Sequence, residues 1–383
     1  MLLKLQSCHE QLLSESKDSI FELLAPTLQF KQRIGKRLGG NPGFKEKMPE
    51  LHLIAAGSLL EFVLDEERFS FPVGRVQFLY LHPLSFEEFM LAQEEQKLLE
   101  LLDNTDLSNP LPSDLHDYLN KQVKKYTILG GMPEAIDTYL VKRSYFSAYT
   151  SQINILKTYR FDFSKYASKA DFKHLEKLFS RAPDLVGSHF KYVNVDRDVK
   201  PETLKMALTK LVQAGVVNRI HATGASGLPL RSQVNEKKFK VLFLDIGLMR
   251  TGMGLEPQEV FEDDLINLRS GVLAEQFVGQ ELLSYSNLYK EKQLYFWERE
   301  KKPSSAEIDY VFNLESKIIP IEVKAGKTGK LRSLQQFMLE KESPVGVRIS
   351  SLPLSFERNI LSVPFYMIKH LSRLLKQVRA AKC

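Results

Sequence analysis

Two short apolar segments near the end of the chain, 307–313 and 318–326, constrain its fold more than any other feature. They run Glu307-Ile-Asp-Tyr-Val-Phe-Asn313 and Ile318-Ile-Pro-Ile-Glu-Val-Lys-Ala-Gly326, with a short turn between them. This pattern predicts two strands joined as a hairpin. Residues two apart in a strand share a face, so Glu322 and Lys324 should project together at a spacing of ~7 Å. The hairpin can place Asp309 on the same face beside Glu322.

A helix expected after Gly271 can bring a further carboxylate to this hairpin. Its apolar side is formed by Leu273, Ala274, Phe277, Val278 and Leu282. Glu275 lies at the edge of that side, where it can turn toward a neighbouring strand. Glu281 is a second candidate, but its helical phase falls inside the apolar arc, which favours a buried structural partner.

These residue types suit metal-dependent phosphodiester hydrolysis. Asp309 and Glu322 would hold Mg²⁺ (or Mn²⁺), which keeps several waters and binds a phosphate oxygen at the same time. The metal would lower the pKa of a bound water and neutralise charge that builds on the phosphate. Lys324 would orient the attacking water or stabilise that charge, and Glu275 would complete the metal shell or hold a metal-bound water. A Glu-x-Lys pair alone is more often a solvated face, whereas the ordered set is more specific.

This ordered set resembles the PD-(D/E)XK nuclease superfamily, the restriction-endonuclease fold that includes archaeal Holliday-junction resolvases. The similarity comprises Gly271-Val-Leu-Ala-Glu275 in a helix, Asp309 in a strand, and Ile321-Glu-Val-Lys324. It implies a restriction-endonuclease-like α/β domain over residues 251–360, with a nuclease site at Glu275, Asp309, Glu322 and Lys324. Many relatives of such folds keep the shape after losing turnover, so a non-enzymatic alternative stays open.

The positive charge of the chain is concentrated in residues 166–250. This segment carries 15 Lys and Arg against 8 Asp and Glu, whereas the rest carries 38 against 39. Such an asymmetry favours a polyanionic partner. A lysine-rich surface with no partner is the equally weighted alternative.

The same segment has the pattern of a winged helix-turn-helix. A helix around 171–179 is followed by one that starts at Pro201 and buries Leu204, Leu208 and Leu211, with Gly215 as its stop. Strands are expected at 216–222 and 239–244, around a glycine-rich turn at 224–227. The residues expected to contact DNA phosphates are Lys200, Lys205, Lys210, Arg219, Arg231, Lys237 and Lys238. The alternative use is as a spacer or protein-docking unit.

Motifs spread over about Pro49 to Ser351 are similar to those of a prokaryotic family of AAA-type ATPases. The motifs are Leu51-His-Leu-Ile-Ala-Ala-Gly-Ser-Leu-Leu60, Phe71-Pro-Val-Gly-Arg75, Pro83-Leu-Ser-Phe-Glu-Glu-Phe89, Gly130-Gly-Met-Pro-Glu134, Leu244-Asp-Ile-Gly-Leu248, and Ala306-Glu-Ile-Asp309 with Ile321-Glu-Val-Lys-Ala-Gly326. In that family an ATPase domain precedes a winged helix and a C-terminal nuclease-like domain of uncertain function. The resemblance implies that Ser58 occupies the sensor position and that Arg75 is a candidate arginine for the γ-phosphate. Strands are expected at 51–58 and 76–81, and a helix capped by Ser85 should follow.

The chain departs from this family at the nucleotide site. It contains no Gly-x-x-x-x-Gly-Lys-Ser/Thr loop, and no apolar run with an acidic pair precedes Leu51. Val241-Leu-Phe-Leu-Asp245 imitates the second motif but lies far downstream, which favours a core strand. The N-terminal half therefore resembles a partial P-loop NTPase with its helical lid, without the nucleotide-binding front. ATP binding is not expected without a partner subunit.

Composition is that of an ordinary globular protein: 383 residues, 43% hydrophobic and 26% charged, with a net charge of +6. Cys8 and Cys383 indicate neither a disulfide framework nor a zinc site, and no apolar run is long enough to span a bilayer. A cytoplasmic, multidomain α/β protein is expected. Its divisions are a leader (1–50), an ATPase-like part (51–165), a winged helix (166–250), a nuclease-like domain (251–360) and a C-terminal helix or tail (361–383).

Two functions follow from these patterns. The first is a DNA-directed, metal-dependent nuclease gripped by its winged helix. The second is a non-enzymatic DNA- or protein-binding remnant of a truncated ATPase. A homo-oligomer or an ATPase partner subunit is compatible with both.

Overall fold

A computed structural model describes residues 78–166, 169–257, 263–291, 293–299, 306–326 and 329–380. Ser58 and Arg75, the leader and the strand expected at 51–58 lie outside these described residues. Within them, no helix combines the length and apolar character needed to cross a bilayer.

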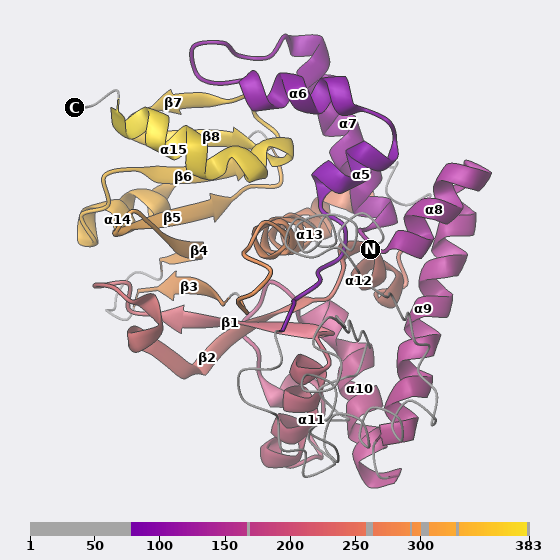
Figure 1. Cartoon of the computed structure of the whole chain (residues 1–383). Helices are drawn as coiled ribbons and strands as arrows, with labels where there is room; N and C mark the ends of the chain where they lie inside the picture. Colours follow the sequence, from indigo (N-terminus) through magenta and orange to yellow (C-terminus); the bar gives the residue numbers. More distant parts are fainter. Residues whose placement is uncertain are drawn as a thin grey trace, which may run out of the picture.

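The described residues form one mixed sheet of eight strands in the order β2-β1-β3-β4-β5-β6-β8-β7 (Figure 1). The strands are β1 (Val217–Thr223), β2 (Val234–Phe243), β3 (Leu294–Glu298), β4 (Glu307–Leu314), β5 (Lys317–Val323), β6 (Gly346–Ser350), β7 (Ser355–Glu357) and β8 (Ile360–Pro364). Three neighbouring pairs are parallel, β1 with β3, β5 with β6 and β6 with β8, and the other four are antiparallel. The expected α/β class is confirmed at this level.

Helices lie on both faces of the sheet and beyond its strand ends (Figure 1). They are α5 (Phe86–Ala92), α6 (Gln96–Asn104), α7 (Ser113–Leu129), α8 (Pro133–Lys142), α9 (Tyr145–Tyr166), α10 (Lys169–Leu185), α11 (Pro201–Gln213), α12 (Ile246–Gly252), α13 (Asp263–Ser284), α14 (Arg332–Glu340) and α15 (Leu371–Ala380). α13 contacts β2 and β5, whereas α14 packs on β4, β5 and β6. Helix α13 therefore stands between the sheet and the N-terminal helices.

Local helix signals in the sequence are realised in the structure. Ser85 caps α5 in a capping box with Glu88, and Pro133 and Pro201 occupy the first positions of α8 and α11. The strand expected at 76–81 is wrong over its described part, because residues 78–81 are in no strand. Tyr80 instead donates one backbone hydrogen bond to the carbonyl of Leu288 at 2.9 Å. A short apolar run without a neighbouring strand to pair with does not become one.

The hairpin expected as a wing is an edge of the large sheet. β1 and β2 pair antiparallel as expected, and Leu204, Leu208 and Leu211 of α11 are buried. Gly215 has a φ of +68°, the left-handed stop. However, β1 also pairs in parallel with β3, so the segment 166–250 shares its sheet with the segment that follows it. The hairpin thereby contributes side chains to the acidic cluster described below.

Three motifs far apart in the sequence meet in a buried hydrogen-bond network, called the hub below. Its members are Leu84, Tyr126, Gly131, Asp245 and Gln280. The Gly131 backbone donates to Asp245 Oδ2 at 2.6 Å, and the Gly131 carbonyl accepts from the backbone of Leu84 at 2.8 Å. Gln280 of α13 donates to Tyr126 Oη at 2.8 Å and to Asp245 Oδ2 at 3.2 Å. Asp245 is fully buried and caps α12, so the 241–245 segment is core, as expected. The hub fastens the N-terminal helices to the sheet.

Helix α13 is longer than expected and carries part of this fastening. It begins at Asp263 rather than after Gly271. Glu281 is buried, and its Oε1 accepts from the backbone of Phe86 at 2.9 Å, which confirms the structural use expected for it. Gln276 both donates to and accepts from the backbone of Phe243.

Candidate metal centre

The hairpin of β4 and β5 brings Asp309 and Glu322 together. Tyr310 pairs with Ile321, so Asp309 lies across from Glu322 in the antiparallel register. Asp309 Oδ2 accepts from the backbone of Val323 at 2.7 Å, and Lys324 Nζ donates to Glu322 Oε1 at 2.5 Å. The arrangement inferred from residue spacing is thus present: two carboxylates side by side with a lysine against one of them.

A bulge in β4 sets the position of Asp309. Trp297 of β3 pairs with Ile308, but Tyr295 pairs with Val311, so Asp309 and Tyr310 together oppose the single residue Phe296. Bulges of this kind re-aim side chains and are common beside functional sites. Tyr310 uses the bulge to donate its hydroxyl to the backbone carbonyl of Glu275 at 2.7 Å. The bulge therefore ties β4 to α13 at the position of the third predicted carboxylate.

Glu275 lies near enough to Asp309 for the two charges to repel, but Glu275, Asp309 and Glu322 do not bring three ligand atoms within 4.8 Å of one another. The partner of Glu275 is Lys240, which was not predicted from the sequence. Lys240 of β2 lies 3.4 Å from Glu275 Oε2 and forms a closer ion pair with Glu307 Oε1. The Lys240 side chain is only 2% exposed and lies over the ring of Phe296. The sequence does contain a signal for this role of Lys240, because the lysine stands between Phe239 and Val241 in a strand pattern. A buried strand excludes a charge that has no partner.

Burial and mutual repulsion shift the titration of these groups. Burial and the neighbouring Asp309 raise the pKa of Glu275 to about 8 and that of Glu322 to about 7. Burial likewise raises the pKa of Asp309.

The basic partners act in the opposite sense. Burial opposes the charge on Lys240, but Glu275 and Glu307 raise its pKa above the ordinary value. Although burial acts to raise it, the pKa of Glu307 is lowered by Lys240 and then by His189. At neutral pH the carboxylates of Glu275, Asp309 and Glu322 therefore have too few cationic neighbours to offset their negative charge.

Glu322 should make the stability of the metal-free protein depend on pH. The folded pKa of Glu322, about 7, exceeds its ordinary value of 4.5, so the folded state binds the extra proton between these pH values. Stability should therefore fall as pH rises from 4.5 to 7, by at most about 1 kcal/mol per pH unit from this group. Glu322→Gln removes this contribution. Urea unfolding in EDTA should give a variant that gains on wild type as pH rises, and parallel pH profiles would contradict the prediction.

The Asp309–Glu322 pair fits a divalent cation. Glu322 Oε2 is buried and has no hydrogen-bond partner among the described residues, and the side chain is only 8% exposed. A buried carboxylate oxygen with no donor is costly unless a cation satisfies it. Mg²⁺ is commonly bound through one or two carboxylates plus waters, so this pair suffices for it.

A second group of ligand atoms lies beside this pair. His189, Glu298 and Glu307 each place one ligand atom within 4.8 Å of the other two, as three side chains that hold a metal ion do. Among the described residues, no other group of three or more His, Cys, Asp or Glu side chains meets this distance criterion. None of its members was predicted from the sequence, because His189 and the two strand carboxylates are far apart in the chain.

The basic residues expected to contact DNA differ in their surroundings. Lys200, Lys205, Arg231 and Lys237 are exposed. Lys238 forms an ion pair with Glu298, and Arg219 is partly buried over the ring of Phe239 and donates to Thr209.

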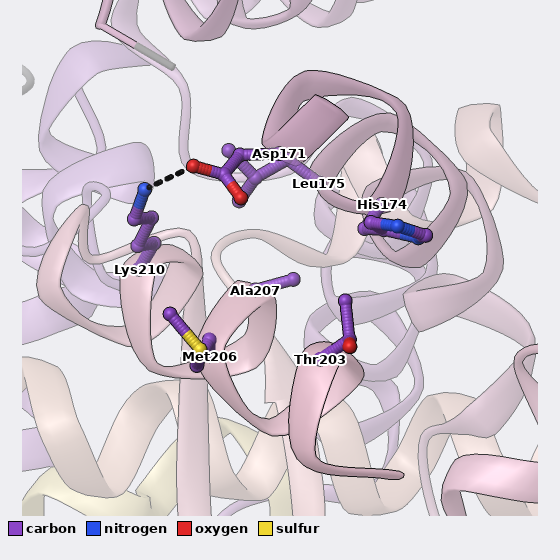
Figure 2. Close-up of a pocket in the computed structure, with 7 residues that line it drawn as sticks. All are labelled: Asp171, His174, Leu175, Thr203, Met206, Ala207 and Lys210. Atoms are coloured by element: carbon purple, nitrogen blue, oxygen red, sulfur yellow. Dashed lines mark hydrogen bonds and ion pairs between the residues drawn. The ribbon is translucent and has the colours of Figure 1, made fainter. Parts of the chain in front are cut away.

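Lys210 lies at a hollow between α10 and α11. Figure 2 shows its ammonium directed at Asp171, 3.4 Å away, across a hollow also lined by His174 and Met206. Three of the seven side chains, Lys210, Arg219 and Lys238, are thus already engaged within the protein.

Comparison with known proteins adds two domain families. Residues 120–259 match a family described as "Domain of unknown function (DUF8612)", and residues 270–366 match "Domain of unknown function (DUF4143)". The second is commonly found C-terminal to AAA domains. No curated protein and no solved structure matches the chain significantly. The acidic cluster draws on both matched segments, since Lys240 lies in the first and Glu275, Asp309 and Glu322 lie in the second.

Proposed function

We propose that the chain is a metal-dependent nuclease of the restriction-endonuclease type, with its site at Asp309, Glu322, Lys324 and Glu275. The observation that carries this proposal is the buried Oε2 of Glu322 next to Asp309, for which the described part of the chain supplies no hydrogen-bond donor. Asp309 and Glu322 would hold Mg²⁺ or Mn²⁺, which when bound supplies an activated water and charge neutralisation. Lys324 holds one oxygen of Glu322 and would position a phosphate, and Glu275 would hold a water.

DNA is the proposed substrate. The exposed Lys200, Lys205, Arg231 and Lys237 support it as phosphate contacts, which grip a duplex without reading its sequence. The winged-helix and AAA-type assignments belong to the same proposal. They rest on the helix–helix–hairpin order, on the sequence motifs, and on the association of the C-terminal domain family with AAA domains. ATP would then be bound by a partner subunit.

The test is cleavage of plasmid and branched DNA with Mg²⁺ or Mn²⁺. Wild type is expected to cleave, and Asp309→Asn is expected to fall to the level seen in EDTA, because the substitution removes one carboxylate of the pair. Asp114→Asn, the same change on the exposed first turn of α7, should leave cleavage unchanged. Equal cleavage by wild type and Asp309→Asn, or none by either, would refute a nuclease site here.

One observation favours a second function, binding without turnover. Lys240 places a fixed positive charge between Glu275 and Glu307. A site that no longer binds metal would need such a charge to neutralise its carboxylates. This alternative predicts salt-dependent DNA binding that survives Asp309→Asn, with no cleavage by either protein. The cleavage assay and a binding titration on the same two proteins separate the alternatives.

A further inference from the structure

His189 is held over the sheet by its neighbours in the chain. Gly187, with φ at +75°, turns the chain after α10, and the backbone of Phe190 donates to the Phe239 carbonyl of β2 at 2.8 Å. The His189 ring stands edge-on to Phe296 of β3, with centroids 5.3 Å apart. These contacts fix where its Nε2 atom points.

Two glutamates face this nitrogen from adjacent strands. Glu298 of β3 and Glu307 of β4 are direct partners in the antiparallel register, and like charges opposite each other destabilise a sheet. His189 Nε2 lies 2.8 Å from Glu307 Oε2 and 3.5 Å from Glu298 Oε2. The sheet thus places two carboxylate oxygens against one imidazole nitrogen.

Two lysines of β2 orient these carboxylates. Lys238 pairs with Glu298 through Oε1, and Lys240 pairs with Glu307 through Oε1. The Oε2 atoms are the ones left toward His189. Outer contacts of this kind fix the ligands of protein metal sites.

We infer that His189, Glu298 and Glu307 form a binding site for a divalent transition-metal ion of the Zn²⁺ class. One imidazole and two carboxylates suit Zn²⁺ better than Mg²⁺, which prefers oxygen ligands alone. In a tetrahedral ion with bonds of ~2.0 Å, two ligands lie about 3.3 Å apart. The separations of 2.8 and 3.5 Å bracket that value. The His189 and Glu307 side chains are each 36% exposed, which leaves one side open to water or a fourth ligand.

This site is distinct from the Asp309–Glu322 pair and does not rest on the proposed nuclease function. Neither Asp309 nor Glu322 belongs to the group of three ligand atoms. The two sites are neighbours through Glu307, which shares Lys240 with Glu275. Zn²⁺ at His189 would draw on Glu307 without using either carboxylate of the proposed nuclease pair.

The experiment is metal binding by the full chain, with Zn²⁺ measured by competition against a chromophoric chelator and Co²⁺ by its visible absorption. His189→Gln is expected to weaken Zn²⁺ binding more than about 100-fold, because losing a ligand should exceed the 10–100-fold typical of outer-contact losses. It should also remove the Co²⁺ band. His221→Gln, a histidine of β1 that packs on Phe239, is the matched control and should bind as wild type does. Glu298→Gln provides a second ligand variant if His189→Gln does not fold.

Three outcomes decide the inference. Loss of the band in His189→Gln, with its retention in Asp309→Asn, supports the site even if DNA cleavage is never observed. Equal Zn²⁺ affinity of His189→Gln and wild type overturns it. Loss of the band in Asp309→Asn alone also overturns it, because the ion would then be bound by the Asp309–Glu322 pair.

Discussion

Gly131→Ala is expected to destabilise the protein by about 3 kcal/mol, because the buried hub has no room for a single methyl group. A Cβ at this position would lie 2.2 Å from the carbonyl oxygen of Leu84 and 2.8 Å from Tyr126 Oη. The closer neighbour is backbone, which cannot swing aside. Any shift of residue 131 would also strain its 2.6 Å hydrogen bond to Asp245. The connection between the N-terminal helices and the sheet should weaken as a unit.

Gly271→Ala is the matched control and should have the opposite sign. Gly271 lies within α13 and is exposed, and a Cβ there would have no neighbour within 4 Å among the described residues outside its own helix. Alanine in a helix interior is favoured over glycine by about 1 kcal/mol. Thermal and urea unfolding of the two variants measure the difference. Similar stabilities of the two proteins would show that the hub does not hold the fold in the way described.

The hub also gives a structural reason for two of the sequence motifs. Gly131 and Asp245 belong to two of the motifs that resemble AAA-type ATPases, and each makes a contact that few other residues could replace. Their pattern therefore reports a packing requirement between helices and sheet. The resemblance at these positions carries information on the fold and none on nucleotide binding.

Sequence reasoning located the elements whose signals are local. The hairpin of Asp309, Glu322 and Lys324 follows from a two-residue periodicity, and helix starts at Ser85 and Pro201 follow from capping chemistry. These features depend on residues within a few positions of one another.

The remaining features depend on how distant segments pack. Lys240 reaches Glu275 only because β1 pairs with β3, which no local pattern indicates. His189 lies beside Glu307 because the backbone of residue 190 pairs with β2. That contact also joins segments that are far apart in the sequence. The bulge at Asp309 likewise requires knowing its partner strand.

Lys240 is the most informative of these non-local residues. The substitution Lys240→Met should lower the free energy of unfolding by about 3 kcal/mol near pH 8 in EDTA. Removing one partner of a buried ion pair leaves the other charge uncompensated, and here that charge is Glu307. Lys240 is 2% exposed and faces Glu275 and Glu307, so methionine fills the space without the charge. The pKa of Glu275 is already about 8 with Lys240 present, and that lysine lowers it. In the variant it should rise further, and the pKa of Glu307 should rise with it.

The sign of the pH dependence distinguishes this account from a simple packing defect. As pH falls from 8 to 5, the folded variant takes up protons on these carboxylates, so the lost stability should largely return. Lys238→Met is the matched control, because its lysine is 45% exposed and its pair with Glu298 should contribute less than about 1 kcal/mol. Urea unfolding at both pH values, with and without millimolar Mn²⁺, measures all of these effects. If the carboxylates bind a cation, Mn²⁺ should restore part of the stability of Lys240→Met at pH 8. An equal loss at pH 5 and pH 8 would mean that Lys240 stabilises the cluster through packing alone.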